Sequence, residues 1–307
     1  MRVATARPAL AAQRPERAQS PWRRLAAEFA ASRLALAALA VLAALAIVAI
    51  AAPWIAPQNP YDLAQLDVLD STLPPGAHSA AGKAYWLGTD DQGRDMLSAI
   101  LFGLRISLTV GVASTVAALA LGIALGLAAA YFGGWLDAAI MRVADIQLSF
   151  PAILIALILL AALGQGVGKI IVALVTVQWA YYARTVRSAA LVERQKEYIE
   201  AARALELPQS RIVIGHLLPN CLPPLIVVAT VQVAHAISLE ATLSFLGLGL
   251  PITEPSLGLL IANGFQYLLS GKYWISFYPG LALLATIMAI NLVADQLRDI
   301  LNPRLKR

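Results

Sequence analysis

The chain has 307 residues, of which 59% are hydrophobic and only 13% are charged. Soluble globular domains average about 45–50% apolar and about 25% charged residues, so this composition excludes an ordinary soluble domain and predicts a membrane protein. One cysteine, three scattered histidines and a net charge of +5 without a basic soluble domain argue against disulfides, metal clusters and nucleic-acid binding.

The first thirty residues are basic. Their charged residues are Arg2, Arg7, Arg14, Arg17, Arg23 and Arg24 against Glu16 and Glu28. We predict that residues 1–30 form a disordered cytoplasmic tail, which could lie on anionic lipid. A cleaved signal peptide is the alternative, but the apolar run that starts at Leu34 begins far from the terminus and is long for such a peptide.

Residues 34–52 are the first predicted span, because they are long enough to cross a bilayer about 30 Å thick. Arg33 precedes this run and Trp54 follows it, which places the N-terminus inside. The polar loop that follows is rich in aspartate and lies outside. Residues 31–100 are therefore the first span with its external loop. Residues 101–307 are the core, with five more spans and a cytoplasmic loop at 191–221.

The external loop ends in a string of turn-forming and capping residues. They read Gly88, Thr89, Asp90, Asp91, Gln92, Gly93, Arg94 and Asp95. We predict a turn that opens the segment leading into the second span. A calcium loop is the alternative, because acidic residues alternate here, but Phe102 stands where such a loop needs its twelfth-position glutamate. No metal site is expected.

Five further apolar runs predict spans. They cover about 108–131, 144–163, 170–190, 222–248 and 278–297. Gly122 and Gly126 in the first of these predict close helix packing, and Pro151 lies inside the next. Basic residues gather at the inner ends of the runs. The fold class is therefore an all-α membrane protein with six transmembrane helices and both termini in the cytoplasm.

Two acidic residues are predicted within or at the edge of the membrane, Asp145 and Glu240. A charged side chain at mid-bilayer costs about 2.5–3.5 kcal/mol on insertion scales, so Glu240 should face the helix bundle and hold a partner. A structural hydrogen bond and a proton relay both fit. A relay through Glu240 or Asp145 predicts an ion-coupled secondary transporter. Such a transporter should show paired repeats of broken helices, and no convincing repeat is visible.

The polar loop between the fourth and fifth runs predicts two short helices. Residues 197–205 have amphipathic spacing, and Pro208 stops that helix. Ser210 can cap a second helix over residues 211–218, which Pro219 ends. A helix this short needs a docking partner, and the alanine-rich apolar face allows close approach.

Four motifs in this chain resemble one family of permeases. Glu200-Ala201-Ala202 with Leu218-Pro219 resembles the EAA loop of ABC-importer permeases, although Glu206 stands where that family usually has glycine. The string 88–95, the run 240–249 and Asn302-Pro303-Arg304 resemble the second permease of dipeptide, oligopeptide and nickel importers. The resemblance implies the type I permease fold of ABC importers in the bacterial inner membrane, with the substrate left open.

The resemblance also implies partners and roles. The partners are a homologous second permease, two ATPase subunits and an external solute-binding protein, within the lipid bilayer. This chain has no phosphate-binding loop and no catalytic constellation, so ATP and Mg²⁺ belong to the ATPases and the chain is not an enzyme. Residues 88–95 would shape an external gate or contact the binding protein. The residues implied in ATPase coupling are Glu200, Ala201, Ala202, Arg203, Leu205, Glu206, Leu218 and Pro219. Glu200 would hold the loop through Arg203 or a neighbouring basic residue, and the two alanines would pack closely.

Overall fold

The computed structural model describes residues 21–62, 66–79 and 82–301. Eleven α-helices dominate this part of the chain, with short 3-10 and π turns and one two-stranded hairpin. The α-helices are α1 (Pro21–Ala30), α2 (Arg33–Ile55), α3 (Met96–Phe132), α4 (Gly134–Leu148), α5 (Ala152–Leu163), α6 (Val167–Glu193), α7 (Glu197–Ala204), α8 (Gln209–Arg211), α9 (Leu218–Phe245), α10 (Leu257–Phe265) and α11 (Trp274–Leu301). The shorter elements are η2 (Val68–Asp70), β1 (Ala77–His78), β2 (Ala84–Tyr85), the π-helix η3 (Ile212–Leu217) and η4 (Leu268–Ser270).

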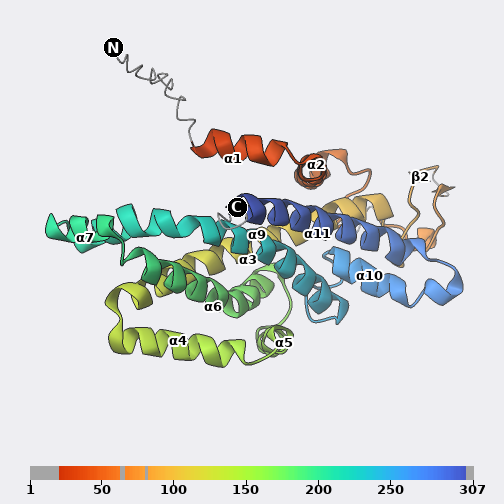
Figure 1. Ribbon diagram of the computed structural model, residues 1–307. Helices are drawn as coiled ribbons and strands as arrows, with labels where there is room; N and C mark the ends of the chain where they lie inside the picture. Colours follow the sequence, from red (N-terminus) through yellow and green to blue (C-terminus); the bar gives the residue numbers. More distant parts are fainter. Residues whose placement is uncertain (1–20, 63–65, 80–81, 302–307) are drawn as a thin grey trace, which may run out of the picture.

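Helices α3, α6, α9 and α11 lie across the view of Figure 1, whereas α2 is seen end-on. Helix α7 lies at one end, and the β1–β2 hairpin and α10 lie at the other. The two strands pair antiparallel, with Ala77 opposite Tyr85. The loop at 197–211 and the string 88–95 therefore lie at opposite ends of the helices, as a cytoplasmic and an external segment should.

Four helical segments are long and apolar enough to cross a membrane, namely α2, α3, the continuous helix Gln209–Phe245 and α11. Helices α4 and α5 pass the same test only as a bent pair, which makes up to five. Helix α6 does not pass it, and its sequence carries Lys169, Arg184 and Arg187. The all-α membrane fold is confirmed, and the count of six spans stays a prediction.

The third predicted span is wrong as a single helix. Helix α4 ends at Leu148, and α5 starts after Pro151 at 91° to it. Proline has no N–H to donate to the preceding turn, and it disfavours helical geometry at the residue before it, here Phe150. The chain therefore turns sharply instead of kinking within one span.

The second predicted loop helix is also wrong in its boundaries. Ser210 lies inside α8, whose N-cap is Pro208, and Pro219 does not end a helix. Helices α8, η3 and α9 form one continuous stretch from Gln209 to Phe245. The π turn widens the helix just before the prolines, where the regular bonding pattern is interrupted. The Nδ2 of Asn220 donates to the carbonyl of His216 at 2.7 Å and so satisfies one acceptor there.

The N-terminal and glycine predictions have different outcomes. Residues 21–30, predicted to be disordered, form α1, whereas residues 1–20 and 302–307 lie outside the described residues.

The close packing at Gly122 and Gly126 is confirmed in the α3–α6 contact. A Cβ added to Gly122 would stand 2.3 Å from the Cβ of Tyr182, and one on Gly126 would stand 2.6 Å from the carbonyl oxygen of Ala183.

Candidate functional site

Helix α7 projects from one end of the molecule and packs on its own chain. Ile199 and Ala202 are buried against Ile212 at the start of the long helix. The close packing of Ala202 is therefore made within the chain, where its methyl group contacts this cluster, and its role in ATPase coupling stays a prediction. Ala201 and Leu205 remain exposed, Leu205 by 74%. They present a small apolar surface at the tip.

The charged residues of this loop also differ from expectation. Glu200 and Arg203 are both exposed, and within the described residues no ion pair joins them. Glu193 at the end of α6 holds the loop instead, since it accepts hydrogen bonds from Lys196 Nζ and from the Tyr198 hydroxyl, each at 2.7 Å. Burial and this carboxylate raise the pKa of Tyr198 to about 12. Glu193 and Lys196 are three residues apart in the sequence, and this spacing could have indicated their ion pair.

Glu206 adopts the left-handed conformation that glycine usually supplies, with φ +52°. The amide of Leu207 donates to the carbonyl of Ala202, and the amide of Glu206 donates to that of Arg203. This is the Schellman pattern that ends a helix, with Glu206 in the glycine position. Leu207 also packs with Ala202. The loop therefore has the turn that the family glycine would make, at a conformational cost.

Replacing Glu206 by glycine should relieve that cost. A left-handed conformation costs a non-glycine residue about 1–2 kcal/mol, part of which glycine loses again to the greater freedom of the unfolded chain. We expect Glu206→Gly to slow amide hydrogen exchange across residues 197–211 by up to about fivefold, equivalent to roughly 1 kcal/mol. Glu206→Ala removes the same charge but keeps Cβ, so it should give no such gain. Equal protection in both variants would contradict the strain argument.

Leu218 and Pro219 do not join the tip of this loop. They begin α9, where Leu218 packs with the cluster formed by Leu217, Cys221 and the α3–α6 contact, while Pro219 is exposed. Cys221 and Leu217 are fully buried there. The two predicted coupling residues therefore lie where the loop enters the long helix rather than on its projecting tip.

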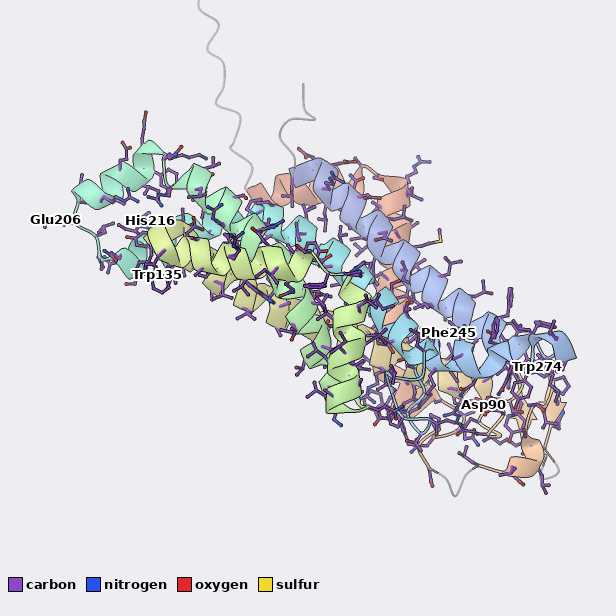
Figure 2. The ribbon with its side chains drawn as sticks, turned by 90° about the horizontal axis from the view of Figure 1, so that it is seen from below. Asp90, Trp135, Glu206, His216, Phe245 and Trp274 are labelled. Atoms are coloured by element: carbon purple, nitrogen blue, oxygen red, sulfur yellow. The ribbon has the colours of Figure 1, made fainter. Side chains whose placement is uncertain are left out.

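At the opposite end, where Figure 2 labels Asp90, most residues of the string 88–95 are buried and form a scaffold. Asp90 and Arg94 have fully buried side chains and form an ion pair with 2.5 Å between Oδ2 and Nε. The Oδ1 of Asp90 accepts the backbone amides of Gln92 and Arg94, each at 2.9 Å. Arg94 Nη1 donates to the carbonyl of Ile252 at 3.1 Å. The string thereby fixes a segment more than 150 residues further along the chain.

The remaining members of the string fix neighbouring loops. Thr89 Oγ1 donates to the carbonyl of Asp70, and the Thr89 carbonyl accepts from Trp274 Nε1 at 3.1 Å. Asp95 caps α3, because its Oδ2 accepts the amide and the hydroxyl of Ser98. Side chains buried in this way cannot themselves contact a docked protein. Of the predicted set, only Asp91 and Gln92 are partly exposed.

The glycines of the string have positive φ and touch backbone. A Cβ on Gly88 would stand 2.6 Å from the carbonyl oxygen of Leu73, and one on Gly93 would stand 2.1 Å from that of Asp67. Beside them, burial and the neighbouring Asp90 raise the pKa of Asp91. Within the part of the chain that the structure describes, no cluster of three or more His, Cys, Asp or Glu side chains could hold a metal. No calcium loop is therefore seen there.

Glu240 is fully buried near the C-terminal end of α9, and its carboxylate has three serine side chains as hydrogen-bond partners. Ser107 on α3 donates to one carboxylate oxygen at 2.9 Å, and Ser244 donates to the other at 2.8 Å. Ser256, which caps α10, is a further hydrogen-bond partner of the carboxylate. One carboxylate thus joins α3, α9 and α10. The structural hydrogen bond predicted for Glu240 is confirmed.

Asp145 pairs across helices rather than along its own. Arg142 is three residues before Asp145, a spacing that allows a pair along one helix, but Arg184 on α6 forms the ion pair, with both side chains about half exposed. A second pair, between Arg187 Nε and Asp137 at 2.5 Å, joins the same two helices. Asp145 therefore helps to hold α4 against α6.

Comparison with known proteins gives concordant matches. The profile of the family "Binding-protein-dependent transport system inner membrane component" matches residues 121–307, and that of the "N-terminal TM domain of oligopeptide transport permease C" matches residues 20–75. The chain is 42% identical over 257 residues to the dipeptide transport system permease protein DppC of Escherichia coli, which covers 83% of this chain and 84% of that protein. It is 37% identical over 256 residues to the di/tripeptide transport system permease protein DppC of Pseudomonas aeruginosa, covering 83% of each.

A solved structure has the same fold. The inward-facing MetNI methionine ABC transporter contains a chain that aligns with a TM-score of 0.54 at 23% identity, covering 67% of this chain and 97% of that one. At this identity the likeness concerns the arrangement of helices alone.

Proposed function

The chain belongs to the family of inner-membrane components of binding-protein-dependent transport systems, and we propose that it forms one half of the translocation pathway of an ATP-driven peptide importer. The relatives transport dipeptides and tripeptides according to their names. Short peptides are therefore the substrate class that we assign, and a nickel chelate is the alternative that the motifs leave open.

The topology that we propose has six spans with both termini in the cytoplasm. Arg33 lies at the start of α2, and Trp54, which is 81% exposed, lies near its end. This order supports a cytoplasmic position for the start of the helix. Helix α6 and the bent pair α4–α5 would complete the count beside the four long apolar helices. Their ion pairs near residues 137–145 and 184–187 would then lie at the cytoplasmic edge.

The coupling proposal depends on one observation. A single continuous helix runs from the loop towards the proposed external face. It comprises 37 residues, from Gln209 to Phe245. At 1.5 Å per residue this is about 55 Å, well beyond the roughly 30 Å of the hydrocarbon core. Helix α7 packs on its inner end through Ile212, and Glu240 lies near its outer end. Displacement of α7 by a docked ATPase would therefore act on both faces of the membrane.

The partners follow from this arrangement. Two ATPase subunits would dock on α7 of this chain and of a homologous second permease, with Glu200, Ala201, Arg203 and Leu205 at the contact. ATP and Mg²⁺ would bind to those subunits, so this chain is assigned no cofactor and no catalytic step. A solute-binding protein would deliver the peptide outside, onto a face whose shape the buried pair Asp90–Arg94 fixes. Closure of the ATPases would switch the interface between two packed states.

Copurification from gentle detergent tests the proposal. We expect the tagged chain to bring down a second permease and ATPase subunits that hydrolyse ATP, and we expect uptake of a labelled dipeptide to survive collapse of the proton gradient while ATP is kept high. A chain that purifies alone and loses uptake with the gradient would instead indicate an ion-coupled carrier.

Ala201→Arg should separate docking from folding. Ala201 is exposed, so the change should leave the stability of the chain within about 0.5 kcal/mol. We expect ATPase copurification and peptide uptake to fall by more than about tenfold, equivalent to at least 1.4 kcal/mol of binding. Ala201→Ser should retain both. A full complement of ATPase on the arginine variant would contradict the assigned contact.

A further inference from the structure

One face of α9 is exposed along most of the helix, and we call this face the α9 stripe. Its members recur at intervals of three, four or seven residues, so they lie on one side of the helix. They are Asn220, Pro224, Val231, His235, Ser238, Thr242 and Phe245. From Asn220 to Thr242 the stripe is about 33 Å long at 1.5 Å per residue, close to the roughly 30 Å of the hydrocarbon core.

Two polar side chains in the middle of the α9 stripe have no partner. Within the described residues, the imidazole of His235 and the hydroxyl of Ser238 make no hydrogen bond, whereas the hydroxyl of Thr242 donates to the carbonyl of Ser238 at 2.8 Å. His235 lies about 15 Å from the C-terminal end of α9 at Phe245, which is near the middle of a bilayer. Such side chains face a bundle interior or a water-filled cavity rather than lipid.

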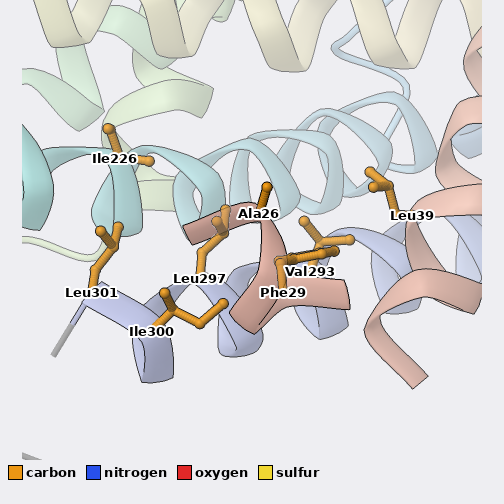
Figure 3. A pocket seen from close by; sticks show the side chains of 8 residues that line it. All are labelled: Ala26, Phe29, Leu39, Ile226, Val293, Leu297, Ile300 and Leu301. Atoms are coloured by element: carbon orange, nitrogen blue, oxygen red, sulfur yellow. The ribbon is translucent and has the colours of Figure 1, made fainter. Parts of the chain in front are cut away.

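Other exposed faces of the long helices are hydrocarbon at this depth. The exposed side chains include Ile47 and Ile50 on α2 and Leu284 on α11. A second groove on α9, towards α1, α2 and α11, is also wholly hydrocarbon (Figure 3). Its lining side chains are Ala26, Phe29, Leu39, Ile226, Val293, Leu297, Ile300 and Leu301. The exposed polar residues of α9, by contrast, all lie on the α9 stripe.

A hollow of about 230 Å³ opens on the α9 stripe near the C-terminal end of the helix. It is lined by Ser238, Ala241, Thr242 and Phe245 of α9, Gly258 and Ile261 of α10 and Leu283 of α11. Pockets that bury a whole drug-sized ligand measure roughly 300–1,000 Å³. The hollow therefore has room for one side chain of a peptide rather than for the whole molecule.

A larger groove lies at the other end of the same stripe. It measures about 750 Å³, and Asn220 and Pro224 of α9 form one wall. The opposite wall belongs to α6 and consists of Arg184, Thr185, Ser188, Ala189, Val192 and Glu193. This wall bears two hydroxyl groups and one charge of each sign, which complements a peptide with an ammonium group at one end and a carboxylate at the other.

We propose that the α9 stripe lines the translocation pathway, where His235 and Ser238 hydrogen-bond the backbone of the passing peptide and the hollow beside Thr242 takes one of its side chains. Every peptide bond offers a donor and an acceptor, so these two groups can pair with a peptide of any sequence. The peptide would leave through the groove between α6 and α9. This assignment rests on the proposed peptide import.

Thiol accessibility in the intact complex tests the position of the α9 stripe. Ser238→Cys and His235→Cys are compared with Leu284→Cys, which is exposed on α11 at a similar distance from the end of its helix. The probe is a charged methanethiosulfonate, which needs a thiolate in water, so both stripe cysteines should react at least about tenfold faster than Leu284→Cys. Saturating dipeptide should slow them. The wild-type chain, whose single cysteine Cys221 is buried, gives the background.

Changes at Thr242 test the hollow through the size of the peptide side chain. Thr242→Phe fills it, so uptake of diphenylalanine should fall at least about tenfold relative to that of glycylglycine. Thr242→Ser enlarges the hollow and should shift this ratio the other way. Leu284→Phe adds the same ring on α11 and should leave the ratio at the wild-type value. A ratio that stays unchanged in both Thr242 variants would overturn the assignment of the hollow.

Two results would overturn the assignment of the stripe. Reaction of both stripe cysteines as slowly as Leu284→Cys would indicate contact with lipid. A crosslink from Ser238→Cys to the second permease, with the thiol protected both with and without ATP, would indicate a contact between permeases. Copurification of the ATPases and dipeptide uptake by the wild type report on the proposed function, whereas thiol reactivity requires neither, so the two proposals can fail separately.

Discussion

Arg94→Ala is expected to be the most destabilising single change outside the helix core, at about 3–5 kcal/mol. The reason is that Asp90 would keep a fully buried carboxylate without its partner, and removing one member of a buried ion pair costs that much. The carbonyl of Ile252 would also lose its donor. The external segment at 246–256 should then come loose from the string 88–95, and protease should cut there first.

The double change Asp90→Ala with Arg94→Ala is the matched control. It removes both charges together, so it should recover a large part of the loss, and the cycle then gives the coupling between the two side chains. Thermal unfolding in detergent and limited proteolysis of the external loop measure the two effects. If the single and double changes are equally unstable, the pair has no net coupling and the loop is held by other contacts.

Glu240→Ala is expected to have the second largest effect, since it removes the acceptor of three serine hydroxyls at once. A buried polar group left without a partner costs about 1–3 kcal/mol. Ser107 and Ser244 are in helices and can turn back to a carbonyl of their own helix, so we expect a total of about 2–4 kcal/mol. Because α3, α9 and α10 would lose the hydrogen bonds that connect them at this carboxylate, peptide uptake should fall even where the ATPases remain bound.

Glu240→Gln distinguishes a structural role from proton transfer. The amide keeps the shape of the side chain and one acceptor oxygen, so most of the stability and uptake should remain. A proton relay would be lost in this variant. Measuring uptake across external pH 5–8 in the wild type and in Glu240→Gln decides between them, because the relay alone predicts a pH dependence that disappears with the carboxyl group.

The sequence predicted the features that depend on short spacings. Gly122 and Gly126 are four residues apart and so lie on one face of a helix, and that face does meet another helix closely. The amphipathic helix at 197–205 also has nearly the predicted bounds. Such patterns report what one helix offers. They do not report which side of the helix already packs within the chain. Ala202 was expected to face a partner, but it packs on Ile212.

The errors arose where distant segments meet. Nothing near Arg94 in the sequence indicates Ile252, and nothing near Glu240 indicates Ser107, because both contacts depend on how the helices cross. Proline residues were a further source of error in the predicted helix boundaries. At Pro151 the chain breaks by 91°, whereas Pro219 lies in a continuous helix because a π turn precedes it. Both prolines have the same backbone preference, so the packing around each one decides whether the helix breaks there.

We expect the long helix to bend more easily near the π turn at Ile212–Leu217 than near Glu240. Prolines 219, 223 and 224 follow it closely and donate no backbone hydrogen bond, while the outer third is secured at Glu240. Such a helix is flexible in the part next to the loop and rigid in the part that Glu240 secures. Small thermal movements of the cytoplasmic loop would be absorbed near the prolines, and only a sustained push would reach the outer face. Small fluctuations of the loop would therefore not open the translocation pathway.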